Sequence, residues 1–225
     1  MRVILFGATG MVGQGVLREC MLDRRVEAVL SVVRRPSGPS LGRKSEKVTE
    51  LVTDDFYNFF KYEDAFAGYD ACIFCLGVSS VGMKEAEYRR VTYDITIAAA
   101  QAVAEANPLS KGGATFVYVS GAGTDANGRA MWARVKGETE KALLAMPFKA
   151  AYMFRPGLIV PMHGIRSKTV VYQRLYSVIR PVLPLLLRMF PRQVTTTEQL
   201  GRAMLDVAMH GYPRQVLEGA DIATV

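Results

Sequence analysis

Three glycines near the start of the chain have the spacing of a turn that binds a diphosphate. They are the first, fourth and last residues of the run Gly7-Ala8-Thr9-Gly10-Met11-Val12-Gly13, which follows an apolar stretch and precedes a helical pattern. Between a strand and a helix, the first glycine permits a tight turn, the second lets the backbone approach the phosphates, and the third lets the helix pack closely. The helix N-terminus then presents free N–H groups to the anion. We therefore predict a dinucleotide site, with a glycine turn that binds no ligand as the alternative.

Two arginines at the end of the second expected strand indicate which dinucleotide is preferred. In NAD-binding sites of this kind, an acidic residue near that position bonds the ribose 2′-hydroxyl. Here Arg34 and Arg35 follow residues 28–33, and no carboxylate takes that place. A guanidinium pairs with phosphate through a planar fork, so the pattern predicts NADP(H) in preference to NAD(H). An exposed basic pair with no ligand is the alternative.

Residues after the next two expected strands are placed to complete the nucleotide site. Asp55 and Phe56 follow the third strand and are predicted to flank the adenine. Gly77 ends the fourth strand, where the lack of a side chain lets the backbone pass close to the ribose.

Short apolar runs alternate with helical patterns along most of the chain. The expected strands span residues 2–6, 28–33, 47–52, 71–76, 115–120 and 150–154, and the expected helices span 11–21, 84–106, 129–144 and 197–209. Such alternation is typical of a parallel sheet, and nearly continuous apolar strands indicate burial on both faces. We predict an α/β fold, a Rossmann-like doubly wound parallel sheet with helices on both faces and a small C-terminal substrate or lid region.

The chain is expected to form one domain, residues 1–225, with a small substrate or lid segment at 157–192. Within that segment, residues 168–192 are apolar and basic, and prolines at 181, 184 and 191 limit helix continuity. This stretch could cover a substrate pocket, contact a second subunit or touch a membrane surface. We favour the cover, because pockets at the carboxyl ends of α/β strands need one.

Composition and charge exclude several classes of protein. The net charge is +7, but no basic helix carries interleaved aromatics, so no nucleic-acid partner is expected. The three cysteines form no disulfide framework, and Cys72 and Cys75 fall on opposite faces of a buried strand pattern. His163 and His210 lack the spacing of metal ligands, so no metal site is expected. Without a signal-peptide pattern or an apolar stretch that could span a bilayer, a cytoplasmic location is expected.

Several segments together resemble the short-chain dehydrogenase/reductase superfamily. The similarity is to its atypical branch of NAD-dependent epimerase/dehydratase-like and Tat-interacting-protein-like oxidoreductases. The matching segments extend over most of the chain and are the glycine run at 7–13, Cys75-Leu76-Gly77, Val119-Ser120, Trp132-Ala133-Arg134-Val135-Lys136-Gly137-Glu138 and Arg155-Pro156-Gly157.

This resemblance implies roles for residues near the nicotinamide. Ser120 matches the serine that ends the fifth strand in the family. Lys136 matches the lysine that bonds the nicotinamide ribose and lowers the pKa of a tyrosine. Pro156 and Gly157 match a turn beside the nicotinamide, and Thr92 falls near the position where relatives carry an asparagine.

The main departure from the family is Trp132, which occupies the position of the catalytic tyrosine. The spacing matches, since Trp132 lies 12 residues after Ser120 (132 − 120 = 12) and four before Lys136 (136 − 132 = 4). A phenol can exchange a proton when a nearby ammonium lowers its pKa, whereas an indole N–H only donates a hydrogen bond. We expect the indole either to stack on nicotinamide or a flat substrate, or to fill a vacated pocket. Tyr88 and Tyr118 are expected to be structural rather than to replace the tyrosine.

We therefore expect an NADP(H)-dependent oxidoreductase that acts on a small carbonyl or conjugated substrate without the usual tyrosine. Ser120 would polarise the carbonyl, and the substrate would take its proton from water. The alternative is a non-catalytic NADP(H)-binding regulatory or sensor protein, which the lost tyrosine and the apolar stretch 168–192 favour. A sugar-nucleotide epimerase ranks third, because such enzymes need the tyrosine and a larger C-terminal domain. Helices equivalent to 84–106 and 129–144 form a dimer surface in many relatives, so a homodimer is also expected.

Overall fold

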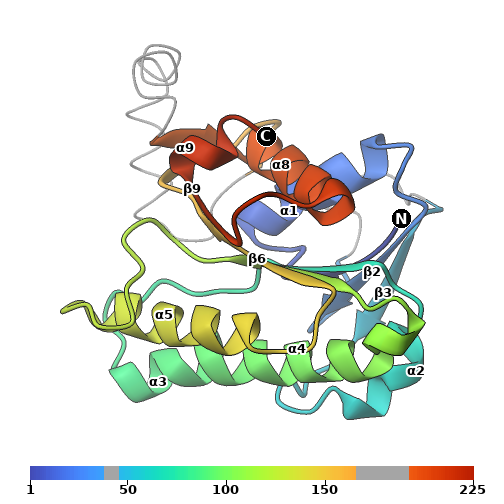
Figure 1. The fold of residues 1–225 in the computed structure, drawn as a ribbon, viewed down its shortest axis with the longest axis horizontal. Helices are drawn as coiled ribbons and strands as arrows, with labels where there is room; N and C mark the ends of the chain where they lie inside the picture. Colours follow the sequence, from blue (N-terminus) through green and yellow to red (C-terminus); the bar gives the residue numbers. More distant parts are fainter. Residues whose placement is uncertain (38–45, 166–192) are drawn as a thin grey trace.

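A computed structural model describes residues 1–37, 46–165 and 193–225 of the chain. Its centre is a seven-stranded sheet in which every pairing is parallel (Figure 1). The strands run in the order β3-β2-β1-β4-β5-β6-β9. In chain order they are β1 (Arg2–Phe6), β2 (Ala28–Val33), β3 (Val48–Val52), β4 (Ala71–Phe74), β5 (Thr115–Val119), β6 (Ala150–Arg155) and β9 (Val216–Glu218).

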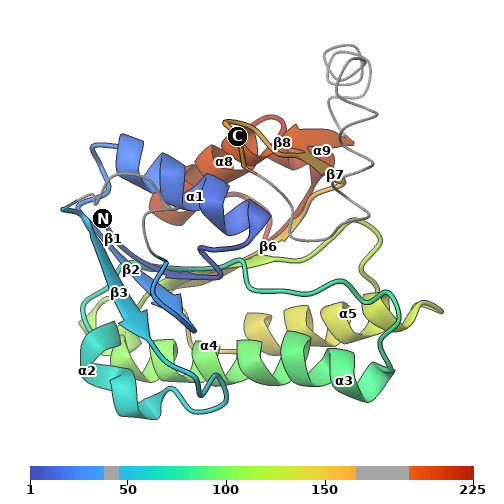
Figure 2. The same ribbon diagram turned by 180° about the vertical axis from the view of Figure 1, so that it is seen from behind.

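Helices cover both faces of this sheet, as Figures 1 and 2 show from opposite sides. One face carries α1 (Met11–Leu22), α8 (Thr197–His210) and the short α9 (Gly219–Ile222). The other carries α2 (Glu63–Phe66), α3 (Glu85–Arg89), α4 (Ile95–Ala106) and α5 (Met131–Leu144). A π-helical turn, η3 (Arg90–Asp94), joins α3 to α4 without a break. The predicted doubly wound α/β fold is therefore confirmed.

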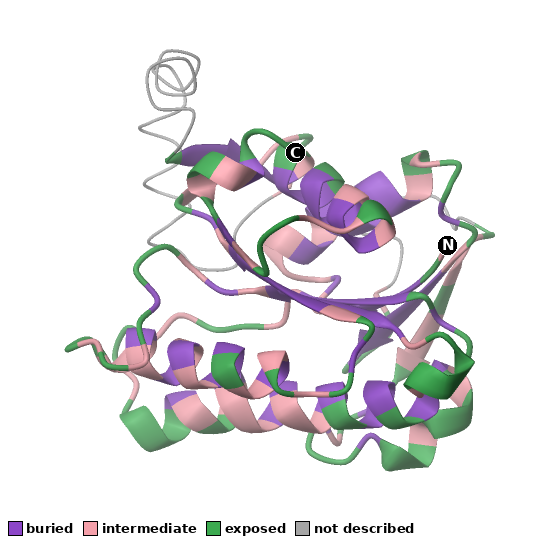
Figure 3. Ribbon diagram, viewed as in Figure 1, coloured by how far each residue is buried: buried purple, intermediate pink, exposed green. Residues whose placement is uncertain are grey.

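The strands are apolar along their whole length because alternate side chains enter two separate cores. Phe6, Phe74 and Phe116 pack with residues of α4 on one side of the sheet. Leu5 and Val117 pack with residues of α1 and α8 on the other. Figure 3 shows the resulting band of buried residues along the sheet. Cys72 and Cys75 belong to opposite cores, as their spacing predicts.

The six expected strands and four expected helices are all present, with shifts at their ends. The expected fourth strand stops at Phe74 rather than at residue 76, and the expected helix at 84–106 contains the π turn. Three strands were not expected: β9 and the parallel pair β7 (Leu158–Val160) and β8 (Val194–Thr196). Each has three residues, which is too short for a recognisable period. The 3₁₀ turns η2 (Phe60–Tyr62) and η4 (Leu109–Lys111) were missed for the same reason.

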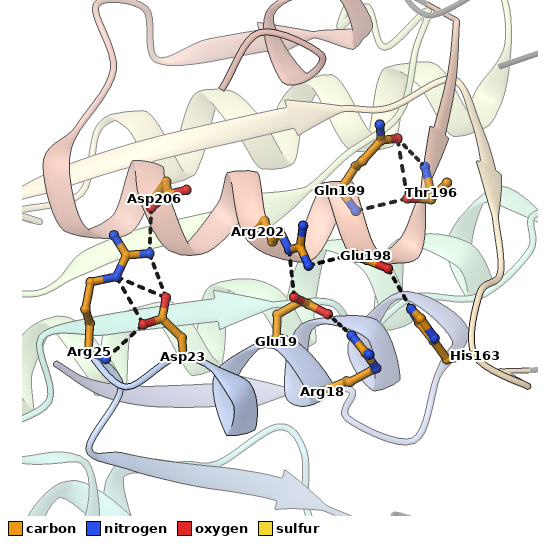
Figure 4. Close-up of polar contacts among 10 residues, drawn as sticks. All are labelled: Arg18, Glu19, Asp23, Arg25, His163, Thr196, Glu198, Gln199, Arg202 and Asp206. Atoms are coloured by element: carbon orange, nitrogen blue, oxygen red, sulfur yellow. Dashed lines mark hydrogen bonds and ion pairs between the residues drawn. The ribbon is translucent and has the colours of Figure 1, made fainter. Parts of the chain in front are cut away.

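Helix α8 packs against α1, and ion pairs join the two (Figure 4). The buried carboxylate of Glu19 accepts a hydrogen bond of 3.0 Å from Arg202, while Arg25 pairs with Asp23 at 2.6 Å and Asp206 at 2.9 Å. A pocket of about 250 Å³ lies among these side chains, at the end of α1 remote from the glycine run. Because its charges pair with each other, we assign it to helix packing rather than to a ligand site.

Most of the expected lid lies outside the described residues. Of the segment 157–192, the structure describes residues 157–165, and the stretch 168–192 falls in the part that is not described. Within the described residues, no helix has the length and apolar character needed to cross a membrane.

Candidate functional site

The glycine run forms the loop between β1 and α1, and two of its glycines are required by close backbone contacts. Gly7 has a positive φ of 82°, and the N–H of Gly10 donates to its carbonyl at 2.9 Å. A Cβ added to Gly7 would lie 2.6 Å from the backbone nitrogen of Leu76, just after β4. A Cβ added to Gly13 would lie 2.1 Å from the carbonyl oxygen of Gly7. Any side chain at position 13 would therefore push α1 away from the loop.

The start of α1 is open to an anion. Gly10 is the N-cap, no side chain caps the helix, and no acidic residue lies in its first turn. The first backbone N–H groups, at Met11, Val12 and Gly13, thus have no acceptor within the helix. The Thr9 carbonyl is held by the side-chain amide of Gln14 at 3.1 Å.

The loop also lies at a switch point of the sheet. β1 stands between β2 and β4 in the sheet. The connection from β1 to β2 runs over one face of the sheet, and the connection that leads on to β4 and β5 runs over the other. In open parallel sheets, ligands bind in the crevice outside the carboxyl ends of strands at such a point. The glycine geometry and the uncapped helix start together fit a dinucleotide pyrophosphate.

Arg34 and Arg35 extend from the carboxyl end of β2 and are exposed. The pairing of β2 with β3 continues one residue past β3, since the N–H of Thr53 donates to the Val33 carbonyl at 2.9 Å. Beyond the arginines, the N–H of Ser37 donates to the Glu50 carboxylate at 3.2 Å, which turns the chain back over β3. Within the described part of the chain, neither guanidinium has a carboxylate partner, so both are available to a phosphate.

The expected adenine-flanking pair is only partly available. Phe56 is buried, with its ring centroid 5.6 Å from that of Phe59 in the aromatic core. The Phe56 ring therefore stabilises the fold. The expectation that this ring contacts the adenine is wrong. Asp55 stays at the surface, where its carboxylate accepts the N–H of Tyr57 at 2.9 Å. Gly77 is exposed, and a Cβ added to it would meet no protein atom within 4 Å. The space beside its backbone is therefore available to the expected ribose.

Ser120 lies directly after β5 and is buried, with its hydroxyl 2.9 Å from that of Thr124. The Thr124 hydroxyl donates its one proton to the Gly121 carbonyl at 2.8 Å. Ser120 must then be the donor in the pair, which leaves its oxygen as an acceptor toward any ligand. To polarise a carbonyl, as expected from the sequence, Ser120 has to turn its proton from Thr124 toward the substrate oxygen.

Lys136 projects from α5 toward the end of β5. Its ammonium donates to the backbone carbonyls of Val119 at 3.2 Å and Ser120 at 3.3 Å, and it stands 5.2 Å from the centre of the Tyr118 ring. Burial lowers the pKa of Lys136 from 10.5 to about 8, and the nearby Glu140 carboxylate partly opposes this shift. The structure thus places Ser120 and Lys136 in contact.

The lowered pKa of Lys136 predicts a pH-dependent contribution to stability. Between pH 8 and pH 10.5 the unfolded chain holds a proton on Lys136 that the folded chain has released. The free energy of unfolding therefore rises with pH across this window, by at most about 3 kcal/mol from this group. Replacing Lys136 with methionine should remove that rise and stabilise the protein at pH 7.

This prediction is checked by urea unfolding at several pH values, comparing each variant with the parent protein. The comparison is needed because the buried thiol of Cys20, whose pKa burial raises to about 12, acts in the opposite direction above pH 9. Lys141→Met, at an exposed position on the same helix, is the control and should leave the pH dependence unchanged. An equal pH dependence in Lys136→Met and the parent would contradict the prediction.

Trp132 stands one turn before Lys136 on α5, and its indole lies against the loop that follows Ser120. A Cβ added at Gly123 would be 3.7 Å from the indole ring, and one at Gly121 would be 4.0 Å away. Trp132 is partly exposed. Its assignment as a stacking platform stays a prediction.

The turn after β6 closes the site from the other side. The Pro156 carbonyl accepts the N–H of Ala122, in the Ser120 loop, at 3.0 Å. A Cβ added to Gly157 would lie 2.3 Å from the carbonyl oxygen of Gln193, so this glycine allows the close approach of β7 and β8. The structure therefore joins the Ser120 loop to the expected nicotinamide turn.

The other residues considered for proton transfer are enclosed. Tyr88 and Tyr118 are buried, and burial raises the pKa of each hydroxyl. This favours the structural role expected for them. Thr92 lies in the π turn, and its buried hydroxyl has no hydrogen-bond partner in the described part of the chain.

The expected residues fall into two groups around the carboxyl edge of the sheet. Arg34, Arg35 and Asp55 lie at the ends of β2 and β3, while Ser120 and Lys136 lie at the end of β5, with the glycine loop between them. The sequence did not indicate Thr124, because a hydroxyl four residues after a serine in a loop has no recognisable pattern. Among the described residues, no group of three or more His, Cys, Asp or Glu side chains could hold a metal ion.

A protein family described as NAD(P)H-binding matches residues 7–153, which include the glycine loop, Ser120 and Lys136. The chain belongs to this NAD(P)H-binding family. This agrees with the resemblance to the short-chain dehydrogenase/reductase superfamily, whose structures share its fold. A nicotinamide nucleotide is thus its cofactor class.

The chain is also similar to curated fungal proteins named FMP52, mitochondrial. It is 29% identical to the Aspergillus niger protein over 160 residues, which cover 70% of this chain and 66% of that protein. It is 30% identical to FMP52-2 of Scheffersomyces stipitis over 169 residues, covering 73% and 67% respectively. The match thus spans about two thirds of the relatives' length. These relatives are named as mitochondrial proteins, so the cytoplasmic location expected from the sequence is wrong.

Solved structures share the fold at low sequence identity. An oxidoreductase of the short chain dehydrogenase/reductase family from Burkholderia thailandensis aligns with a TM-score of 0.70 at 17% identity, covering 99% of this chain and 92% of its own. A UDP-glucose 4-epimerase aligns with a TM-score of 0.65 at 15% identity, covering 100% and 80%. At these identities the likeness shows the Rossmann-like fold alone.

Proposed function

We propose that the protein is an NADP(H)-dependent oxidoreductase that works without the catalytic tyrosine of its superfamily. The observation that carries the cofactor preference is the exposed pair Arg34 and Arg35 at the end of β2. Neither has a carboxylate partner in the described part of the chain, and Arg is suited to a 2′-phosphate. Negative charge at that position would instead favour a 2′-hydroxyl.

The chemistry of the site supports reduction of a small carbonyl or conjugated substrate. Bound NADPH supplies a hydride. Ser120 contacts the substrate oxygen, and Thr124 sets whether the serine donates or accepts. Trp132 offers a flat apolar wall that orients a planar substrate and excludes water. Since an indole does not ionise usefully, the proton comes from water rather than from the tyrosine position.

A non-catalytic NADP(H)-binding regulator is the second candidate. The observation that favours it is the arrangement of Lys136, whose ammonium is directed to the carbonyls of Val119 and Ser120, together with tryptophan at the tyrosine position. In this alternative the bound nucleotide stabilises one conformation of the loops around the site, and Trp132 serves packing.

Trp132 is the only tryptophan of the chain and therefore reports on the site directly. We expect NADPH to quench its fluorescence with a Kd about 100-fold lower than that of NADH, as two charge-assisted contacts to the 2′-phosphate, one from each arginine, would give. If neither nucleotide changes the emission or raises the melting temperature, the proposed cofactor site is wrong.

The same preparation separates the two candidates. NADPH absorbance is followed in the presence of quinones, aldehydes and α,β-unsaturated carbonyl compounds. The oxidoreductase is supported if the parent protein consumes NADPH and the Ser120→Ala variant consumes it more slowly, while the NADPH affinity of the variant stays within a factor of about two. Tight NADPH binding with no consumption of any of these substrates supports the regulator.

A further inference from the structure

An exposed arginine lies over the ring of an exposed tyrosine that follows β3. The guanidinium carbon of Arg90 lies 5.6 Å from the centre of the Tyr57 ring, within the usual range of a cation–π contact. Tyr57 is 47% exposed, although a large aromatic ring is more often buried. The two residues come from segments far apart in the sequence, the chain after β3 and the π turn before α4.

Arg90 differs from its neighbour Arg89 in having no charged partner among the described residues. Arg89 pairs with Glu138 and lies over the ring of Tyr93 at 4.3 Å, so its charge is used between helices. Within the described residues, the Arg90 guanidinium makes no hydrogen bond or ion pair, and Tyr57 is its one ring contact. The Arg90 side chain is also exposed, and it is therefore accessible to a ligand.

The position of the pair follows from the sheet order. Val33, the last residue of β2, is in register with Val52, the last residue of β3, so both strands end at the same level. Tyr57 follows five residues after β3 (57 − 52 = 5), and its N–H is held by the Asp55 carboxylate. Figure 2 shows the chain after β3 beside the long helix that contains the π turn. Tyr57 is thus within five residues of the carboxyl end of β3, which stands beside the end of β2 that carries Arg34 and Arg35.

On the basis of the proposed NADP(H) site, we infer that Arg90, held in place by Tyr57, stacks on the adenine of the bound nucleotide. A guanidinium is planar and stacks on aromatic faces, so it can lie between the tyrosine ring and a purine. Phe56 cannot take this role because its ring is in the core. Stacking recognises the adenine itself, whereas Arg34 and Arg35 recognise the 2′-phosphate.

These two roles give different patterns of affinity. NADPH, NADH and 5′-AMP share the adenine, and only NADPH carries the 2′-phosphate. Loss of stacking at Arg90 should weaken all three by the same factor, about tenfold for alanine. Loss of a phosphate contact would weaken NADPH alone.

The test measures the Kd of the three nucleotides by calorimetry, with the full chain and its Arg90→Ala and Arg90→Lys variants. We expect both variants to weaken the binding of NADPH, NADH and 5′-AMP about equally. Lysine keeps the positive charge but has no planar guanidinium that could stack on the adenine. Tyr57→Leu should act in the same direction with a smaller effect, and Tyr57→Phe should bind as the parent does. Lys61→Ala is the matched control, since its ammonium lies 5.1 Å from the Tyr62 ring in a similar contact.

Three outcomes would overturn the inference and leave the proposed cofactor site standing. The first is unchanged affinity in Arg90→Ala while the parent binds NADPH. The second is a loss confined to NADPH, which would make Arg90 a phosphate ligand. The third is an Arg90→Lys variant that binds all three nucleotides as the parent does. Failure of the parent protein to bind NADPH or NADH would instead overturn the proposed function.

Discussion

Replacing Gly13 with alanine is expected to weaken NADPH binding about 100-fold and to lower the melting temperature by about 10 °C. The added Cβ would lie 2.1 Å from the Gly7 carbonyl oxygen and 2.9 Å from the Cα of Ala8, both backbone atoms that cannot rotate away. The start of α1 must then move away from the loop. Because that loop and helix start together form the expected pyrophosphate site, the shift acts on binding as well as on stability.

The measurement is a titration with NADPH well below the melting temperature, so that the variant remains folded. Gly201→Ala in α8 is the control, because its added Cβ would lie 3.0 Å from the Glu19 side chain and 3.3 Å from the Gly15 carbonyl. It should lower the melting temperature and leave NADPH affinity close to that of the parent. A Gly13→Ala variant that binds NADPH as the parent does would rule out the predicted role of the loop.

The double variant Arg34→Ala, Arg35→Ala should lose about 100-fold in NADPH affinity and almost none in NADH affinity. Each charge-assisted hydrogen bond to the 2′-phosphate contributes about 1.5–3 kcal/mol, and neither arginine has a carboxylate partner in the part of the chain that the structure describes. NADH offers a hydroxyl at the same position, so the removed cations change little there. The preference for NADPH should therefore disappear rather than merely decrease.

Fluorescence of Trp132 gives both affinities, at low and at physiological salt. The control is Arg24→Ala, Lys111→Ala, which removes the same net charge from two exposed positions near the starts of β2 and β5. It should leave both affinities unchanged, since the cations there face away from the carboxyl edge. Equal losses in the two double variants would show that overall charge, and not Arg34 and Arg35, attracts NADPH.

The proposed catalytic half of the site was less predictable than the nucleotide half. Ser120 and Lys136 were identified by resemblance, and the structure brings them together, with the Lys136 ammonium 3.3 Å from the Ser120 carbonyl. Thr124 was not foreseen, although it decides which way the Ser120 proton points. Hydroxyl direction depends on neighbours that only the folded loop brings into contact.

The adenosine half shows the same limit. Asp55 and Phe56 were both expected beside the nucleotide, because they follow a strand that ends at the correct edge. Their side chains point in different directions, and the ring of Phe56 enters the aromatic core with Phe59. The contact between Tyr57 and Arg90 joins segments 33 residues apart (90 − 57 = 33), and no local pattern marks it.

The sequence by itself determined the α/β fold, the order of the long elements and the position of the nucleotide loop. These depend on local causes: apolar periodicity, the conformational freedom of glycine and the charge that follows a strand. Only the tertiary structure decided which side chains at the strand ends face the site, how Ser120 is hydrogen-bonded and where the three-residue strands pair. Those features depend on contacts between distant segments, whose side chains are directed by packing rather than by their neighbours in the chain.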